Sequence, residues 1–235
     1  TNCTISNNTA GGSAGGIGMQ SKNFHITDST FKYNEAKGLY TAYPGNGGGL
    51  VMRGWDSYAY NCTFINNTAT KFYGGAISTE DGFERNNANV TIRDCYFENN
   101  AAPIGGAIQG KGDYLLIDNC TFKDNYAVQG GAVFLEGENL TIINSRFYDN
   151  NATHDNLNSR GIVTGQSYLP QITEWRARGG AVYIQGVNAR LNNNTFSFNS
   201  LYEVKDDIVK YVDVTKQSFN IYVAGGDSYG NIDNV

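Results

Sequence analysis

Hydrophobic residues along the 235-residue chain fall into short alternating stretches that recur at the same phase. Three examples are Asn89–Ile92, Tyr114–Ile117 and Asn139–Ile142. In the first, Val90 and Ile92 alternate with polar residues and are expected to point inward from a strand; Leu140 and Ile142 take the same phase in the third. No stretch keeps the 3.6-residue period of an amphipathic helix. The pattern predicts an all-β chain.

A four-residue cassette, Phe-x-x-Asn, divides the chain into repeats. Its copies begin at Phe31, Phe64, Phe97, Phe122, Phe147 and Phe196, and Ile5–Asn8 is a degenerate first copy. Between the copies stands Gly-Gly followed by a small or aliphatic residue, beginning at Gly15, Gly48, Gly74, Gly105, Gly130 and Gly179. Phe97, Phe122 and Phe147 are 25 residues apart, which suits one coil of a solenoid with about three short strands. The repeat predicts a parallel β-helix of about seven to eight coils.

Stacking such coils in register places each repeated residue on its own copy. We expect one internal ladder of Phe and another of Asn, whose buried amides bond from coil to coil. The Gly pair is expected where the backbone needs a positive φ or a close approach. An Asn or Asp three residues before each Phe is expected to turn a left-handed, buried corner. Those corner residues are Asp28, Asn61, Asp94, Asn119, Asn144 and Asn193.

Composition narrows the class of protein. The net charge of −5 and the charged fraction of 17% argue against nucleic-acid binding, which needs basic patches. A hydrophobic fraction of 40% favours a packed structure over a disordered tract, and no apolar run of about 18 residues occurs. We expect residues 1–235 to form a single domain. Because the chain starts in the middle of the repeat, we also expect it to be a fragment of a longer surface protein.

The four cysteines share one position, two residues before the cassette Phe or Ile. Cys62, Cys95 and Cys120 are expected on consecutive coils, while Cys3 faces Ser29. Buried free thiols that act as small hydrophobes are the favoured interpretation. The chain has no Cys-x-x-Cys and only two histidines, so we expect no metal site and no cofactor.

Insertions enlarge one corner, after the cassette Asn, in three coils. They span residues 35–47, 151–178 and 200–218, and should project from the same side. Opposite charges on the last two could simply hold them together. The alternative is that exposed aromatic and Arg side chains bind a partner. The candidate ligand-binding residues are Tyr40, Tyr43, His154, Arg160, Tyr168, Trp175, Arg176 and Arg178.

Two aromatic residues outside these insertions could also lie on the surface. Trp55 and Tyr58 either line the surface beside the first insertion or cover the core. Their role depends on where the preceding coil places its loop.

A catalytic site is not expected. Glycoside hydrolysis needs two carboxylates held at a fixed separation, and Asp94, Asp118 and Asp149 fall at different phases of the coil. The pair Asp206-Asp207 lies in a loop without an obvious base. The sequence therefore favours a protein that is not an enzyme.

Asn-x-Ser/Thr sequons are frequent and compatible with a secreted glycoprotein. Asn7, Asn66 and Asn151 are the preferred glycosylation sites, because they lie in or beside exposed corners. Asn61, Asn119 and Asn193 are worse candidates, because their corner is expected to be buried.

Alternation of Phe-x-x-Asn with Gly-Gly-Ala-Ile/Val resembles the polymorphic outer membrane protein repeats of chlamydial autotransporters. The fuller cassette, from Asn139–Phe147 to Gly179–Tyr183, is even more similar to adhesin-like surface proteins of methanogenic archaea. The resemblance covers almost the whole chain. It implies a right-handed parallel β-helix displayed outside the cell, at the cell surface, and offers no catalytic residues to carry over.

The resemblance leads to a surface adhesion module whose partner is a protein or glycan of another cell. One alternative is a subunit of an extracellular filament or sheath that self-associates end to end. A polysaccharide lyase or hydrolase is the least favoured. We expect neither nucleic acid as a partner nor direct membrane insertion of this segment.

Overall fold

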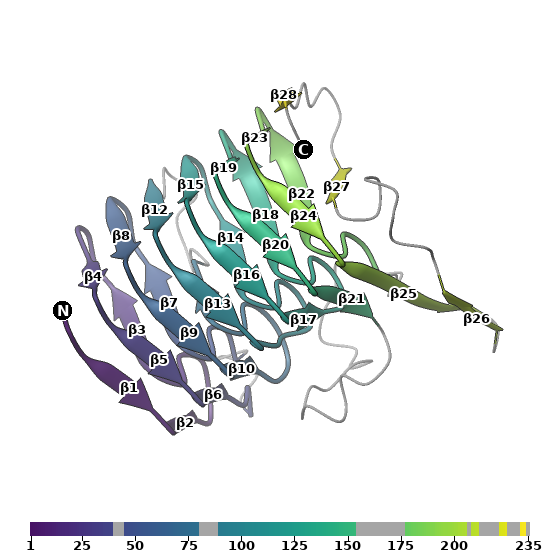
Figure 1. The fold of residues 1–235 in the computed structure, drawn as a ribbon. Helices are drawn as coiled ribbons and strands as arrows, with labels where there is room; N and C mark the ends of the chain where they lie inside the picture. Colours follow the sequence, from purple (N-terminus) through teal and green to yellow (C-terminus); the bar gives the residue numbers. More distant parts are fainter. Residues whose placement is uncertain are drawn as a thin grey trace.

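A computed structural model describes residues 1–39, 45–79, 89–153, 177–205, 208–211, 221–224 and 231–233. The chain winds through four faces per turn, and equivalent strands of adjacent coils pair in parallel along each face (Figure 1). The described residues form seven such coils, which agrees with the predicted number.

Sheet A contains the cassette Phe. Its strands are β1 (Thr4–Ser6), β5 (Thr30–Lys32), β9 (Thr63–Ile65), β13 (Tyr96–Glu98), β16 (Thr121–Lys123), β20 (Arg146–Tyr148) and β24 (Thr195–Ser197). Sheet B follows the cassette Asn and is short. It consists of β2 (Thr9–Ala10), β6 (Glu35–Ala36), β10 (Thr68–Ala69), β17 (Tyr126–Ala127), β21 (Asn151–Thr153), β25 (Ser200–Lys205) and β26 (Ile208–Tyr211). Isolated bridges of Ala101 to Thr68 and Tyr126 join its two parts.

Sheet C begins just after the Gly pair. Its strands are β3 (Ile17–Gln20), β7 (Leu50–Arg53), β11 (Ile77–Ser78), β14 (Ile108–Lys111), β18 (Val133–Glu138), β22 (Val182–Val187) and β27 (Ile221–Ala224). Sheet D leads back to sheet A. It consists of β4 (His25–Thr27), β8 (Ser57–Tyr60), β12 (Val90–Arg93), β15 (Leu115–Asp118), β19 (Thr141–Ile143), β23 (Arg190–Asn192) and β28 (Asn231–Asp233).

The cassette Phe residues form the predicted ladder inside sheet A. From Phe31 to Phe196, neighbouring ring centroids lie 4.6–5.0 Å apart and the planes differ by 4–11°. Val90 and Ile92 of β12 point into the same core, as their alternation predicted. Stacking of the rings adds to the gain from burial at every step.

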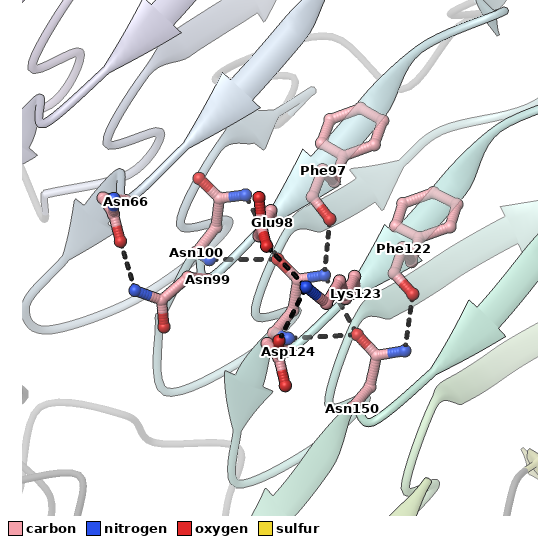
Figure 2. A network of polar contacts seen from close by, with 10 residues as sticks. Asn66, Phe97, Glu98, Asn99, Asn100, Phe122, Lys123, Asp124 and Asn150 are labelled. Atoms are coloured by element: carbon pink, nitrogen blue, oxygen red, sulfur yellow. Dashed lines mark hydrogen bonds and ion pairs between the residues drawn. The ribbon is translucent and has the colours of Figure 1, made fainter. Parts of the chain in front are cut away.

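The cassette Asn residues form the second predicted ladder, and all are buried from Asn34 to Asn199. From Asn34 to Asn150, each side-chain Nδ2 donates to Oδ1 of the Asn on the next coil, at 2.8–3.1 Å. The other Nδ2 hydrogen goes to the carbonyl oxygen three positions before the equivalent Asn of the preceding coil, as from Asn150 to Phe122 (Figure 2). Buried amides are thus satisfied, and the expected coil-to-coil bonding is confirmed.

The Asn and Asp corner between sheets D and A has the expected left-handed backbone, with φ of 50–55°. It is not buried, however. Asn61, Asn119 and Asn193 are exposed, although each donates its side-chain amide to the corner residue of the preceding coil. The left-handed conformation favours Asn whether or not water reaches it, so the residue type does not report burial.

The Gly pair serves both expected purposes. In the later coils the first Gly has a positive φ, and a Cβ on the second would collide with backbone, as Gly106 would with the carbonyl oxygen of Gly131. In the first two coils the alignment is shifted by one residue. Leu50 pairs with Ile77, so Gly47 and Ala14 take the left-handed position, and Gly49 stands where Ala76 does.

The three insertions are shorter than predicted at the ends that the structure describes. Glu35 and Ala36 form β6, and Gly47 belongs to the regular ladder. Asn151–Thr153 forms β21 and pairs with β25, which continues into an antiparallel hairpin with β26 (Figure 1). In all three coils a strand of sheet B therefore occupies the predicted start of the insertion, directly after the cassette Asn. The seventh strand of sheet C is β27, which pairs with β22.

Candidate ligand-binding groove on the outer face of sheet D

Seven of the eight ligand-binding residues predicted from the sequence lie outside the described residues. These are Tyr40, Tyr43, His154, Arg160, Tyr168, Trp175 and Arg176. Arg178 is described and half-buried, and its backbone forms a bridge to Gln129. It therefore belongs to the regular coil rather than to a projecting loop.

The three preferred glycosylation sites differ in exposure. Asn7 is exposed at a left-handed corner. Asn66 is half-buried and accepts a hydrogen bond from the side chain of Asn99 (Figure 2). Asn151 lies in β21 with its Oδ1 buried. Of the three, Asn7 has the most exposed side chain in the described structure.

A groove of about 470 Å³ lies on the outer face of sheet D, over the first coils. It is lined by Thr27, Asp56, Ser57, Tyr58, Ala59, Tyr60, Asn89, Thr91 and Arg93. These residues come from β4, β8 and β12 and from the corners that precede β8 and β12. Three strands paired in register hold them, so the groove is built on rigid elements.

The alternation of β8 explains why the groove has an aromatic floor. Ser57 and Ala59 point inward and are buried, which leaves Tyr58 and Tyr60 on the outer face. The Tyr58 ring stacks on His25 of the preceding coil, with centroids 4.0 Å apart and planes 23° apart. Tyr60 is 43% exposed, so part of its side chain is available for contact.

Each charged side chain that lines the groove has a partner. Arg93 Nη2 lies 2.9 Å from Oδ2 of Asp118, and Oδ1 of Asp118 accepts a hydrogen bond from the Asn144 amide at 2.8 Å. Asp56 lies 3.7 Å from Nζ of Lys22 and accepts from the Asn89 amide at 2.7 Å. The groove therefore combines phenol, amide and hydroxyl groups with charges that are compensated locally.

A second polar cluster covers the outer face of sheet A. Lys123 Nζ lies 2.8 Å from Oε1 of Glu98 and 3.6 Å from Oδ2 of Asp124 (Figure 2). The Lys123 hydrogen bond lowers the pKa of Glu98, and the same bond raises the pKa of Lys123. Burial, with Glu98 and Tyr148 nearby, raises the pKa of Tyr96 to about 12.

All three shifts move these groups away from neutral pH. A general acid or base works best with a pKa near the working pH. The cluster on sheet A therefore has the properties of a structural ion pair, and its residues are not suited to proton transfer at pH 7.

The carboxylates considered from the sequence do not form a catalytic pair in the described structure. Asp94 turns a left-handed corner and accepts the Asn119 amide at 2.5 Å, and Asp149 turns another corner. Asp118 was expected to be isolated, but Arg93 and Asn144 both contact it. The repeat held the signal for the first contact, because Arg93 and Asp118 are register partners on adjacent coils 25 residues apart.

Cys62, Cys95 and Cys120 lie on consecutive coils as buried free thiols, which confirms the interpretation of the ladder. Each thiol faces backbone carbonyls, as Cys95 faces that of Arg93 at 3.1 Å. Contact with Cys95 and burial raise the pKa of Cys62, and burial raises that of Cys95. Cys3 is exposed and receives no such cover.

The described parts of the chain hold no group of three or more His, Cys, Asp or Glu side chains placed to bind a metal ion. Within the same residues, no helix is long and apolar enough to cross a membrane.

Tyr60, Asp56 and Arg93 were not among the binding residues predicted from the sequence. The signal was present in the run Ser57-Tyr58-Ala59-Tyr60, where small residues alternate with tyrosines. In an ordinary half-buried strand the large hydrophobic side chains point inward. Here the inward positions are small and the large aromatic side chains point outward. Its meaning depends on which residues of the neighbouring coils stand beside it.

Stacked parallel coils around one Phe core define a solenoid, and the groove lies on one of its outer faces. The right-handed β-helix region family matches the chain over residues 1–108 and 46–228, so the protein belongs to this family. The predicted right-handed parallel β-helix is thereby confirmed. Neither the curated proteins nor the solved structures gave a match. The family includes both enzymes and proteins that are not enzymes.

Proposed function

We propose that the protein is an extracellular, adhesin-like module that attaches to a partner along the side of its β-helix. The groove on sheet D is the observation that carries this proposal. Its volume lies in the range of sites that enclose small ligands or parts of larger ones. Its floor offers Tyr58 and Tyr60, and aromatic side chains of this kind dominate binding energies at interfaces.

The chemistry of the groove favours binding over catalysis. Asp56 and Asp118 are each engaged with a cation and an amide, and neither stands opposite a second free carboxylate among the described residues. Hydrolysis or elimination would need a group free to take or give a proton. The non-enzymatic role is part of the proposal.

Display outside the cell is supported by surface chemistry. Asn7 presents an Asn-x-Thr sequon at an exposed corner, which is where N-glycosylation is possible in a secreted protein. The acidic net charge of −5 suits a surface that does not bind nucleic acid. Location at the cell surface is therefore proposed together with adhesion.

The test is binding of the purified, fluorescently labelled protein to an array of glycans and of cell-surface proteins. The double variant Tyr58→Ala/Tyr60→Ala is compared with Tyr33→Ala. The control removes an exposed tyrosine at the corner between sheets A and B, away from the groove. We expect the wild type and Tyr33→Ala to bind alike and the groove variant to lose most binding. Equal binding by all three would show that the groove is not the attachment surface.

A second arm concerns the insertion of coil six. Replacing residues 154–176 by a short Gly-Ser linker leaves β21 and the Arg178 bridge in place. If this variant loses binding and the groove variant does not, the attachment surface is the insertion and not the groove. Electron microscopy of the same samples covers the filament alternative, because ordered fibres in place of single rods would overturn the adhesion proposal.

A further inference from the structure

Three aromatic residues occupy left-handed corners that other coils fill mainly with Asn or Asp. Tyr33 has a φ of 56°, Tyr114 of 59° and Phe198 of 53°. The other left-handed residues on the ladder of Tyr114 are Asn23, Asp56, Asn89, Asn139 and Asn188.

The left-handed conformation is unfavourable for a bulky side chain, whereas Asn and Asp tolerate it. Burial does not compensate for the strain here, because Tyr33 is 55%, Tyr114 53% and Phe198 81% exposed. Asn would hold the same corner with less strain and would expose less apolar surface. Strained residues are concentrated at functional sites, so each of the three is a candidate whose surroundings decide its role.

Tyr114 is distinguished from the other two by its position. Its ladder also contains Asp56 and Asn89, and both of these line the groove. Paired strands place Tyr114 on the coil directly beyond Asn89, whose backbone N–H donates to the carbonyl of Asp113 at 3.0 Å. Tyr114 therefore stands at the end of the groove that faces the middle of the solenoid.

We propose that Tyr114 is a ligand-binding residue, and that the ligand is an uncharged glycan lying along the solenoid axis from Tyr58 to Tyr114. This inference rests on the proposed function and names its ligand class. Tyr58 and Tyr114 lie on coils two and four, so they are about 10 Å apart along the solenoid axis at the usual spacing of paired strands. That length accommodates a short oligosaccharide.

Aromatic rings with polar tips suit a sugar, whose faces are apolar and whose rim carries hydroxyls. The groove offers such tips at Tyr58 and Tyr60, and amide and hydroxyl groups at Asn89 and Thr91. These groups can donate to sugar hydroxyls and accept from them.

The charges point to an uncharged ligand. An acidic polymer needs unpaired cations, but Arg93, the one cation that lines the described groove, is held by Asp118. A cationic ligand needs an unpaired carboxylate, but Asp56 is engaged by Lys22 and Asn89. Displacing either pair would expose the charge that remains.

The experiment measures affinity by isothermal titration calorimetry of the full chain with two sets of hexasaccharides. The neutral set contains β-linked oligomers of glucose, mannose and galactose, and the acidic set contains oligogalacturonides. We expect binding from the neutral set only, with less than about a twofold change in affinity between 50 and 500 mM salt. Binding confined to the acidic set, or affinity that collapses with salt, would overturn the assignment of an uncharged ligand.

Tyr114→Asn tests the residue itself, with Tyr33→Asn as the matched control. Both substitutions relieve the strained corner, so both should raise the melting temperature by about 2–4 °C. Only Tyr114→Asn should weaken binding, by about tenfold. Unchanged affinity in Tyr114→Asn, or an equal loss in Tyr33→Asn, would contradict the role given to Tyr114.

The outcomes separate this inference from the function on which it rests. If no saccharide binds but a surface protein does, and Tyr58→Ala/Tyr60→Ala abolishes that binding, adhesion stands and the glycan assignment fails. If neither glycans nor surface proteins bind, both proposals fail.

Discussion

Nδ2 of Asn100 lies 3.1 Å from Oδ1 of Asn125 on the next coil. The same nitrogen lies 2.9 Å from the carbonyl oxygen of Phe64 on the preceding coil, and Oδ1 of Asn100 accepts from both nitrogens of Asn67. One buried amide therefore joins three consecutive coils. The polar ladder is fully bonded at this position and needs no water to satisfy it.

Replacing Asn100 by Ala is expected to be severely destabilising. The change leaves the backbone and side-chain N–H groups of Asn67 and the carbonyl of Phe64 without their partner in a buried site. Each unsatisfied group costs about 1–3 kcal/mol, so the free energy of unfolding should fall by about 3–5 kcal/mol. Urea denaturation followed by circular dichroism measures it.

The control for Asn100→Ala is Asn119→Gly on the exposed corner ladder. It also deletes an amide, but glycine tolerates the left-handed φ of 51° and water can replace the lost bond. We expect a loss of less than about 1 kcal/mol. Similar losses for the two variants would mean that burial of the Asn100 amide does not determine its contribution.

Thiol accessibility provides a second prediction. Cys3 is exposed, whereas Cys62, Cys95 and Cys120 are covered by the core and face backbone carbonyls. In native protein a disulfide reagent should react rapidly with one thiol per chain, and with the other three only after denaturation. Cys3→Ser should abolish the rapid phase. Rapid reaction of more than one thiol would show that the core opens readily.

The ion pair of Glu98 and Lys123 predicts a dependence of stability on pH. The Lys123 hydrogen bond holds the pKa of Glu98 below its ordinary value of 4.5. Such a carboxylate stabilises the fold above its unfolded pKa, and this contribution is lost as the pH falls through the folded pKa. The stability difference between wild type and Glu98→Gln should therefore be largest near pH 7 and vanish on acidification below pH 4.5.

Chemical denaturation at a series of pH values between 3 and 7 measures this difference. Lys123→Gln should show the same loss of pH dependence, because it removes the other half of the pair. The effect should be small, since both side chains are partly exposed to solvent. A difference that stays constant from pH 7 to pH 3 would contradict the assignment.

Two phenylalanines predict opposite effects on stability. Phe147 is fully buried between two stacked rings, so Phe147→Ala should cost about 3–5 kcal/mol. Phe198 is 81% exposed at a left-handed corner, so Phe198→Asn should stabilise the fold by about 1 kcal/mol. Thermal unfolding of both variants checks this. A destabilised Phe198→Asn would mean that Phe198 makes contacts that offset its strain.

The repeat made the interior predictable. Once coils stack in register, a residue such as Phe97 or Asn100 meets its own copy on each side, so its surroundings follow from the sequence alone. The same reasoning fails where a residue pair matches the repeat motif but is shifted by one position relative to it. Gly48-Gly49 was aligned one residue off, because Gly47 and Ala14 hold the left-handed position that Gly74 holds later.

The outer faces were much harder to predict. Asn61 was assigned to a buried corner because Asn favours a left-handed backbone in either setting, and only the packing shows that water reaches it. Tyr60 and Arg93 were not selected at all. They become neighbours because β8 and β12 pair across 33 residues, and each position on an outer face differs from coil to coil.

The spacing of the Phe rings has a consequence for how such a chain can change. Phe97 and Phe122 are 25 residues apart, and Phe147 and Phe196 are 49 apart, yet both ring pairs stack at 4.8 Å. A difference of 24 residues is thus accommodated at one corner without altering the stacking of the Phe rings on adjacent coils. That corner is a natural point for grafting foreign sequence, where evolution or an engineer can exchange segments while the scaffold keeps its geometry.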